Sequence, residues 1–284
     1  MIKGLEPDAH GLHQKSTRLD PIQFGRGNVV KSVAIVTGAS QGIGRSTAIR
    51  LARDFSAIVL AARNSSALND VADSVSCAGA EPLVCDLDLA KAESAEALVR
   101  ASLDRFGRID ALLNIAGAVP QIDLFEMTDE QWREGMELKL HGARRVTMLA
   151  WNALKESKGS VVFMSGSAAF DPKPAFAAVA ATNAAINALA KAFAEQGIRD
   201  GVQVNSIVPG AVMTGRRRSF LEHWAPAHKM SVEGATKQFP EKAEINRYGR
   251  PEEIGDLLAF MVSPAAKWMT GAAVRMDGGE IKAI

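Results

Sequence analysis

The sequence predicts an α/β fold, in which a single domain is built on one doubly wound parallel sheet with helices on both faces. Three observations lead to this prediction. Short apolar runs alternate with helix-spaced apolar patterns from residue 33 to residue 279. The first run, 33–37, passes through a glycine-rich turn directly into a helical pattern. The run at 57–62 is apolar at every position, which is typical of a strand buried on both faces of a parallel sheet.

The other elements follow in order without a linker. Further strands are predicted near 82–84 and at 110–113, 159–164, 201–208 and 272–276. Helices are predicted at 65–78, 90–106, 175–196 and from Pro251 onward, together with a long helix from the capping box at 128–131 to about 155. Strands and helices that alternate in this way form a parallel sheet, because each helix crosses back over one face.

The composition is that of an ordinary globular protein. The 284 residues are 47% hydrophobic and 23% charged, with a formal net charge of +1, which predicts neither a nucleic-acid partner nor a membrane partner. No segment approaches the roughly 20 apolar residues that span a bilayer, and the first residues are polar, so we expect a cytoplasmic protein. Cys77 and Cys85 lack a metal-ligand pattern, so no metal site is expected.

The first residues, 1–28, show neither helical nor strand periodicity, so we expect an N-terminal arm outside a main domain at 29–284. Two interpretations of the arm stay open. It is either a flexible leader or a segment that packs on a neighbouring subunit. No catalytic residue is expected in it.

The glycine-rich turn is a candidate phosphate site. Glycine allows close backbone approach, and the helix that follows presents unpaired N–H groups at the positive end of its dipole. Together these features predict a pyrophosphate site. The turn consists of Gly38, Ser40, Gln41, Gly42, Ile43 and Gly44, with Ala39 between the first two. Its spacing, Thr-Gly-x-x-x-Gly-x-Gly, differs from the common Rossmann fingerprint and resembles that of the short-chain dehydrogenases/reductases.

Further segments support this resemblance in the correct order. Asn114-Ile115-Ala116-Gly117 is similar to the family's Asn-Asn-Ala-Gly, and 209–214 matches Pro-Gly-x-Val-x-Thr. The resemblance implies a Rossmann-like fold that binds a nicotinamide cofactor. It implies cofactor contacts at Asp86 and Leu87 beside the adenine, at Asn114, Ala116 and Gly117, and at Pro209, Gly210, Val212 and Thr214 around the nicotinamide.

The end of the second strand predicts which cofactor is bound. An acidic residue there binds the ribose hydroxyls of NAD, whereas an arginine accommodates the 2′-phosphate of NADP. Ala62 stands where an acid would, and Arg63 and Arg45 supply positive charge nearby. We therefore expect NADP to be preferred over NAD.

The resemblance breaks at the catalytic positions. The family uses a tyrosine as acid/base, a lysine four residues later, a serine that orients the carbonyl group and an asparagine in a proton relay. The matching positions hold Val179, Asn183, Gly166 and Lys139. Tyr248, the only tyrosine, lies in a structural turn. All four catalytic positions are therefore substituted.

Two explanations of these substitutions compete. The chain is either an atypical oxidoreductase related to carbonyl and alcohol oxidoreductases, with Lys139, Ser167 and Asn183 as candidate catalytic residues, or a pseudoenzyme that acts as a partner subunit or an NADP-responsive regulator. A non-redox lyase or isomerase is a lesser alternative. Because Lys139 and Asn183 look like the family's lysine and asparagine exchanged between facing helices, we predict that the Lys139 ammonium lies within hydrogen-bond reach of Asn183.

Residues 215–245 have no single period, and the resemblance implies a substrate lid there. The arginine tract 216–218 in this segment either meets an anionic substrate or is a solvated helix face. The substrate is a small molecule that the sequence does not name. In the family the helices that match 128–155 and 175–196 pair across subunits, so we expect a homo-oligomer, a tetramer.

Overall fold

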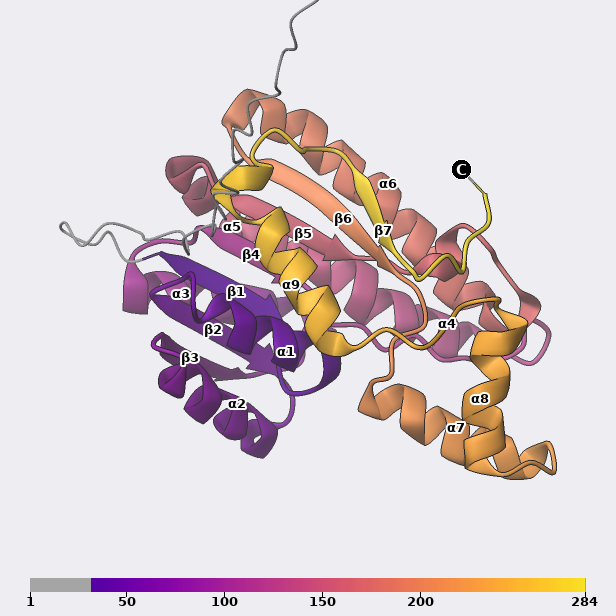
Figure 1. The fold of residues 1–284 in the computed structure, drawn as a ribbon. Helices are drawn as coiled ribbons and strands as arrows, with labels where there is room; N and C mark the ends of the chain where they lie inside the picture. The colour runs from indigo at the N-terminus through magenta and orange to yellow at the C-terminus, as the bar shows by residue number, and fades with distance from the viewer. Residues whose placement is uncertain (1–31, 284) are drawn as a thin grey trace, which may run out of the picture. The chain divides into compact units, whose positions relative to one another are not determined.

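Seven parallel strands form one sheet, in the order β3-β2-β1-β4-β5-β6-β7, in the computed structural model, which describes residues 32–283 (Figure 1). This confirms the fold class that the sequence predicts. The predicted arm at 1–28 lies outside the described residues. The strands are β1 (Val33–Thr37), β2 (Ala57–Ala62), β3 (Glu81–Asp86), β4 (Ala111–Asn114), β5 (Ser160–Met164), β6 (Gln203–Pro209) and β7 (Ala273–Met276).

The central strands are buried on both faces. Every residue of β1, β4, β5 and β6 is buried, whereas the edge strands β3 and β7 are partly exposed. The chain runs outward from β1 to β3, then returns to β4 on the other side of β1. This reversal opens a crevice at the carboxyl ends of β1 and β4, where ligands bind in open α/β sheets.

One face of the sheet is covered by α1 (Gly42–Leu51), α2 (Ser65–Cys77) and α9 (Pro251–Met261). Their buried side chains include Leu68 and Leu258, which belong to the same cluster as Val36 of β1. The glycine-rich turn joins β1 to α1 on this side, so the packing of α1 fixes the position of the turn.

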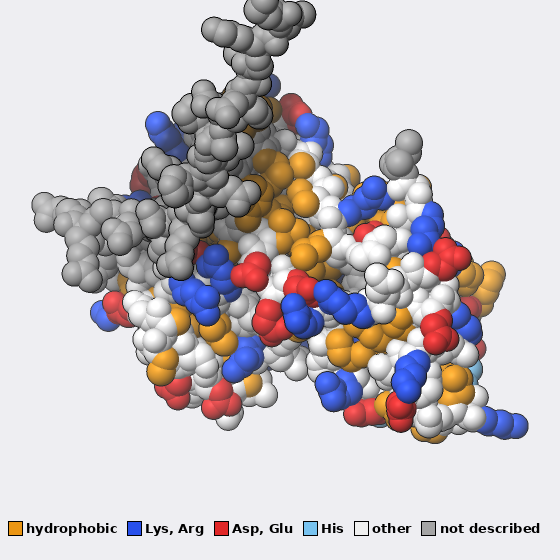
Figure 2. Space-filling model, in the orientation of Figure 1, with side chains coloured by type: hydrophobic (Ala, Val, Ile, Leu, Met, Phe, Trp, Pro, Cys, Tyr) orange, Lys and Arg blue, Asp and Glu red, His pale blue; other side chains and the backbone are white. Residues whose placement is uncertain are grey.

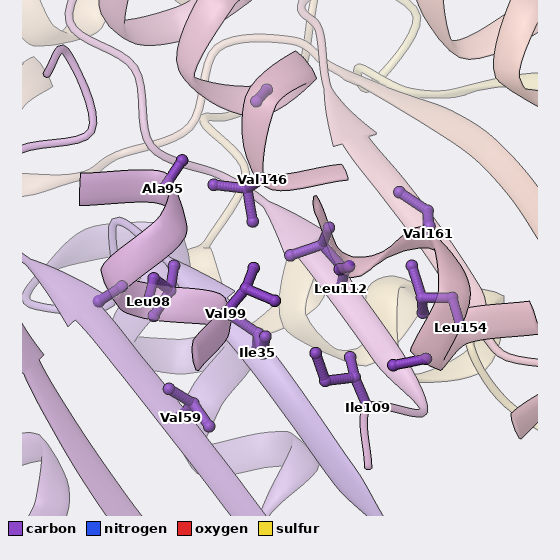
Figure 3. Packing of buried hydrophobic residues seen from close by; sticks show 14 of the residues in the cluster. Ile35, Val59, Ala95, Leu98, Val99, Ile109, Leu112, Val146, Leu154 and Val161 are labelled. Atoms are coloured by element: carbon purple, nitrogen blue, oxygen red, sulfur yellow. The ribbon is translucent and has the colours of Figure 1, made fainter. Parts of the chain in front are cut away.

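The other face is covered by α3 (Ala92–Phe106), α5 (Ala143–Ser157) and α6 (Ala177–Asp200). Figure 3 shows Leu98 of α3 and Val146 of α5 over Ile35 and Leu112 of the sheet. Each large aliphatic side chain buried in this way contributes about 2 kcal/mol.

A long helix forms over the predicted range but changes its winding partway. It begins as α4 (Asp129–Met136) behind the predicted capping box, continues as the π-helical turn η1 (Glu137–Gly142) and ends as α5. A π-helical turn inserts an extra residue and shifts the side chains that follow it, and such turns are frequent at functional sites. Lys139 lies inside this turn.

The predicted lid consists of two helices, α7 (Gly215–Ala227) and α8 (Val232–Lys242), which lie together at one side of the domain in Figure 1. They pack around a small cluster of their own that includes Leu221, Ala235 and Tyr248. Two short helices explain why this segment shows no single period. The Tyr248 ring stacks on Phe239 with 5.6 Å between centroids, which supports its structural role.

Three short 3₁₀ turns lie in the connections between these elements. Two are between β5 and α6, η2 (Ser167–Ala169) and η3 (Pro174–Phe176), and η4 (Pro264–Ala266) is between α9 and β7. Among the described residues, only the helical stretch Pro174–Asp200 is long and apolar enough, by length and composition, to cross a membrane. This stretch contains α6, whose Ile186 and Ala190 belong to the core cluster under the sheet. On the face shown in Figure 2, acidic and basic side chains are interspersed. The cytoplasmic location stays a prediction.

Candidate active site

A cleft of about 480 Å³ lies in the crevice at the carboxyl ends of β1 and β4. We call the part formed by the turn 38–44 the glycine end and the part formed by Lys139 and its neighbours the lysine end. The residues predicted to bind cofactor that line this cleft are Gly38, Ser40, Gln41, Gly42, Ile43, Gly44, Arg63, Leu87, Ala116, Gly117 and Thr214. Of the three candidate catalytic residues, only Lys139 lines it.

At the glycine end, Gly38 and Gly44 have no room for a side chain. A Cβ atom on Gly44 would lie 2.1 Å from the Gly38 carbonyl oxygen, and one on Gly38 would lie 2.9 Å from the Ala116 Cα atom. Gly38 and Gly42 also have positive φ angles of 69° and 54°, which residues with a side chain rarely adopt. The backbone therefore forms a concave cradle that opens on the N-terminus of α1.

The cradle is tied to the loop after β4 by Thr37. Its buried hydroxyl accepts hydrogen bonds from the backbone N–H groups of Ile115 and Ala116, both at 3.0 Å, and donates to the Leu113 carbonyl oxygen at 3.3 Å. One side chain thus fixes the ends of β1 and β4 relative to each other. This explains why a threonine precedes the first glycine of the turn.

At the far side of the cradle, the cleft reaches the ends of β2 and β3. Arg63 lines it with an exposed side chain, whereas Arg45 is exposed on α1 and does not line it. Leu87 lines the cleft and Asp86 does not. Four residues that follow these strands also line the cleft and were not predicted from the sequence: Asn64, Ala67, Asp88 and Leu89. Asn64 caps α2 by accepting a hydrogen bond from the Ala67 N–H at 3.0 Å. An asparagine directly before a helical pattern is the sequence signal that marks such a cap.

The other predicted cofactor residues lie behind or beside the cleft. Asn114 is buried, and its side-chain nitrogen donates to the Thr147 hydroxyl at 3.0 Å, so it connects β4 to α5. Pro209 ends β6. Gly210 and Val212 line a neighbouring cleft of about 450 Å³.

At the lysine end, Lys139 and Asn183 meet as predicted. The Lys139 ammonium donates to the Asn183 side-chain oxygen at 2.5 Å and to the Ser165 carbonyl oxygen at 3.4 Å. The Ser165 hydroxyl donates to the Asn183 backbone oxygen at 2.9 Å. These bonds join η1, α6 and the end of β5, and they confirm that Lys139 and Asn183 face each other.

The environment of Lys139 changes its acidity. Burial of the ammonium and, to a smaller extent, the positive charge of Arg216 together lower the pKa of Lys139 from its ordinary value of 10.5 to about 8. The lysine is therefore a much better proton donor near neutral pH than a solvent-exposed lysine.

Two glycines make room for this pair. A Cβ atom on Gly166 would lie 2.8 Å from the Asn183 side-chain nitrogen, and one on Gly117 would lie 2.9 Å from the Lys139 Cδ atom. Gly166 itself has φ of 169°, which is ordinary extended backbone. Glycine is thus required at position 166 by the neighbouring side chain and not by backbone strain.

The remaining candidates lie outside the cleft lining. Ser167 begins η2, and its hydroxyl interacts with the carboxyl group of Glu280. Burial raises the pKa of Glu280, and the hydrogen bond from the Ala211 N–H at 2.9 Å opposes that shift. Val179 is half-buried in the first turn of α6 and presents no polar group.

Arg216 is a cleft residue that the sequence reasoning did not single out from its tract. Its guanidinium donates to the carbonyl oxygens of Gly117 at 3.2 Å and Val119 at 2.7 Å, which brings the start of α7 against the loop after β4. Arg217 instead lies over the Phe239 ring at 5.1 Å, and Arg218 is exposed. The only distinguishing signal was that Arg216 comes two residues after Thr214.

Comparison with known proteins identifies the family. A family model described as enoyl-(acyl carrier protein) reductase matches residues 38–280. The 3-oxoacyl-(acyl-carrier-protein) reductase of Synechocystis is 30% identical over 252 residues, which cover 88% of this chain and 96% of the relative. The chain belongs to the short-chain dehydrogenase/reductase family.

Solved structures of this family agree with the fold. L-sorbose reductase from Gluconobacter frateurii, in complex with NADPH and L-sorbose, superimposes with a TM-score of 0.85 at 28% identity, covering 89% of this chain and 98% of that chain. A variant of actinorhodin polyketide ketoreductase with NADPH gives a TM-score of 0.82 at 30% identity, covering 88% and 97%.

Proposed function

We propose that the protein binds NADP(H) in the cleft and acts as an atypical carbonyl reductase in which Lys139 donates the proton. The observation that supports this most directly is the Lys139 ammonium, which lines the cleft, is held by Asn183 and has a pKa lowered to about 8. A family member without the tyrosine acid/base still needs a group that protonates the alcohol oxygen, and Lys139 is suited to that role.

The glycine end fits a dinucleotide. Gly38 and Gly44 allow the backbone of the turn to pack closely, and α1 begins there without an acidic residue in its first turn, so the helix N-terminus is free to bind a phosphate. Arg63 lies on the cleft wall at the end of β2, where a 2′-phosphate is recognised. Relatives solved with NADPH support the same cofactor. We infer that NADP is preferred over NAD.

When bound, NADPH supplies a hydride to a carbonyl carbon, and the electron pair of the C=O bond moves to the oxygen. The Lys139 ammonium then transfers a proton to that oxygen, which leaves a neutral amine. Asn183 and the Ser165 carbonyl oxygen hold the lysine nitrogen in place through the transfer. Because the lysine end opens on the cleft, water can return a proton to the amine.

The pseudoenzyme hypothesis is favoured by a different observation. Val179 and Gly166 replace both hydroxyl groups that the family places beside the substrate carbonyl, and nothing polar stands in their place at those two positions. In that case the lysine–asparagine pair is structural compensation alone, and the protein binds the cofactor as a partner subunit or regulator.

The experiment that separates these hypotheses measures binding and turnover on the same preparation. Fluorescence titration with NADPH should give saturable binding in the wild type and in Lys139→Ala. Oxidation of NADPH with a panel of aldehydes and ketones should occur in the wild type, be lost in Lys139→Ala and persist in Lys91→Ala, which changes an exposed lysine at the N-cap of α3. The value of kcat/KM should fall as pH rises through about 8, because this parameter follows the free enzyme, in which Lys139 loses its proton there.

Other results would change the assignment. Saturable NADPH binding without turnover of any carbonyl compound would establish the pseudoenzyme. Conversion of a substrate without a change in NADPH absorbance would indicate a lyase or isomerase. Turnover that survives Lys139→Ala would mean that another group donates the proton.

We also infer a homo-oligomer, a tetramer, assembled through the helices at 128–155 and 175–196. Three large apolar side chains on these helices or close to them face solvent in the isolated chain. They are Met148 (55% exposed), Leu149 (47% exposed) and Ile198 (65% exposed). Light scattering of the purified protein should give four times the mass of one chain, and Met148→Glu should dissociate the assembly.

A further inference from the structure

We propose that the substrate carries an anionic group, a carboxylate or a phosphate, which binds between the side chains of Lys139 and Arg216 at the lysine end of the cleft. This inference rests on the proposed function, because it names the class of carbonyl compound that the reductase takes. It adds a recognition role for Arg216.

Among residues 32–283, no acidic side chain binds the Lys139 ammonium or the Arg216 guanidinium. Lys139 binds only the Asn183 amide oxygen and the Ser165 carbonyl oxygen, and Arg216 binds only two backbone carbonyl oxygens. The one acidic residue in the described cleft wall is Asp88, which follows β3 at the opposite end of the sheet's crevice. The lysine end therefore holds two positive charges and no negative one.

Several arginines with partly buried side chains have carboxylate partners. Arg108 binds Asp110 at 2.6 Å, and Arg145 binds Glu137. Arg217, the neighbour of Arg216 in sequence, has the Glu280 carboxyl close enough to oppose the effect of burial on its pKa. Among the described residues, Arg216 thus differs from these three arginines in having no carboxylate beside it.

The protein environment is electrostatically unfavourable for both cations. Burial and the charge of Arg216 lower the pKa of Lys139, so this ammonium is held in an unfavourable environment. The Arg216 guanidinium, although exposed on one side, loses part of its solvation to the cleft wall, which lowers its pKa as well. A bound anion offsets both the lost solvation and the mutual repulsion of the two cations, because it attracts each of them.

Lys139 and Arg216 both keep hydrogen-bond donors that an anion can use. A guanidinium has five N–H donors and an ammonium has three, while the structure shows two hydrogen bonds for each. The planar guanidinium fits a carboxylate or phosphate with two parallel bonds. Arg216 is exposed toward the cleft, so a ligand reaches it.

The position of the pair favours the substrate over the cofactor as the source of the anion. The glycine end already offers the α1 N-terminus for a pyrophosphate, and Arg63 stands at the end of β2 for a further phosphate. Lys139 and Arg216 instead meet around Gly117 in the loop after β4, beside the residues that face the substrate in our proposal.

The test uses the full-length protein saturated with NADP⁺, so that no hydride is available and binding is measured alone. Isothermal titration calorimetry follows pyruvate, 2-oxoglutarate and glyceraldehyde 3-phosphate, each beside a neutral counterpart: methyl pyruvate, dimethyl 2-oxoglutarate and glyceraldehyde. The measurements are repeated with Arg216→Gln, with Arg216→Lys and with the matched control Arg218→Gln, whose side chain is exposed on the same helix.

We expect at least one anion to bind about tenfold or more tightly than its neutral counterpart. Arg216→Gln should weaken the binding of that anion by about tenfold, Arg216→Lys by less, and Arg218→Gln not at all. The affinity for NADP⁺ should stay the same in all variants. Thermal unfolding identifies any variant that does not fold. If Arg216→Gln does not fold, the anion affinity of Arg216→Lys is compared with that of the wild type instead, because this variant keeps the charge.

Three results would overturn the inference: no probe binds, neutral and anionic probes bind alike, or Arg216→Gln weakens NADP⁺ binding as much as anion binding. The last result would assign the anion site to the cofactor. Failure of the reductase hypothesis gives a different pattern. In that case an anion binds through Arg216 in a protein that never oxidises NADPH. Conversely, reduction of neutral carbonyl compounds without anion binding would keep the reductase and reject this inference.

Discussion

The glycine end and the lysine end belong to the same crevice of the sheet, but different parts of the chain fill the space in each. At the glycine end, backbone meets backbone: a Gly44 Cβ atom would lie 2.1 Å from the Gly38 carbonyl oxygen. At the lysine end, side chain meets side chain: Lys139 fits against Gly117, and Asn183 fits against Gly166.

This difference explains which part of the family pattern is kept. A contact between two stretches of backbone has no alternative residue, so the glycine turn retains its spacing. A contact between side chains can be rebuilt when the neighbours change together, as packed cores show. The substitutions at 139, 166 and 183 form one mutually fitted set. We propose that they are a rearranged site and not three independent losses.

The largest expected effect tests the rigidity of the glycine end. Gly44→Ala brings a methyl group to 2.1 Å from the Gly38 carbonyl oxygen, so it should destabilise the fold by about 3 kcal/mol and abolish NADPH binding. Gly215→Ala is the matched control, because a Cβ atom there has nothing within 4 Å. Chemical denaturation and fluorescence titration measure both variants. If Gly44→Ala binds NADPH like the control, the backbone cradle is not as restrictive as we describe.

The next effect tests whether the lysine end is a coupled set. Gly166→Ser restores the family residue but drives its Cβ atom against the Asn183 side-chain nitrogen, so it should cost about 2 kcal/mol in the free energy of unfolding. In an Asn183→Ala background the same change should cost about 1 kcal/mol less. Denaturant titration of the two single variants and the double variant gives this coupling. Additive effects would mean that positions 166 and 183 do not constrain each other.

A smaller effect compares two arginines that the sequence treats alike. Arg63 lines the cleft and Arg45 does not, so Arg63→Ala should reduce the preference for NADPH over NADH by about tenfold, which is about 1.4 kcal/mol. Arg45→Ala should leave the preference within about twofold of the wild type. Fluorescence titration with both cofactors measures the ratio. A larger effect at Arg45 would show that its side chain turns toward the cofactor on binding.

The sequence predicted the sheet, most of the helix ranges and the glycine-rich turn because those features are local. It did not predict the two helices α7 and α8. The strand at 33–37, the turn and α1 are contiguous, and apolar spacing marks each of them. The meeting of Lys139 and Asn183 was also predicted, from the positions that a family resemblance assigns to two separate helices.

The rest depends on contacts that sequence spacing does not contain. Arg216 reaches Gly117 and Val119 only because α7 packs back against the loop after β4, nearly a hundred residues earlier in the chain. The π-helical turn at Glu137–Gly142 has no signal in a pattern that is helical throughout. Asn114 carries a motif position but is buried against Thr147, which only the packing of α5 reveals.

The most direct measurement is the pKa of the Lys139 ammonium in the folded protein, followed by NMR of ¹³C-labelled lysine side chains across the pH range and assigned with Lys139→Met. The account predicts one lysine that titrates at about 8 and disappears from the spectrum of the variant. A Lys139 that titrates at its ordinary value of 10.5 would contradict it, because such an ammonium is not poised to donate a proton at the lysine end.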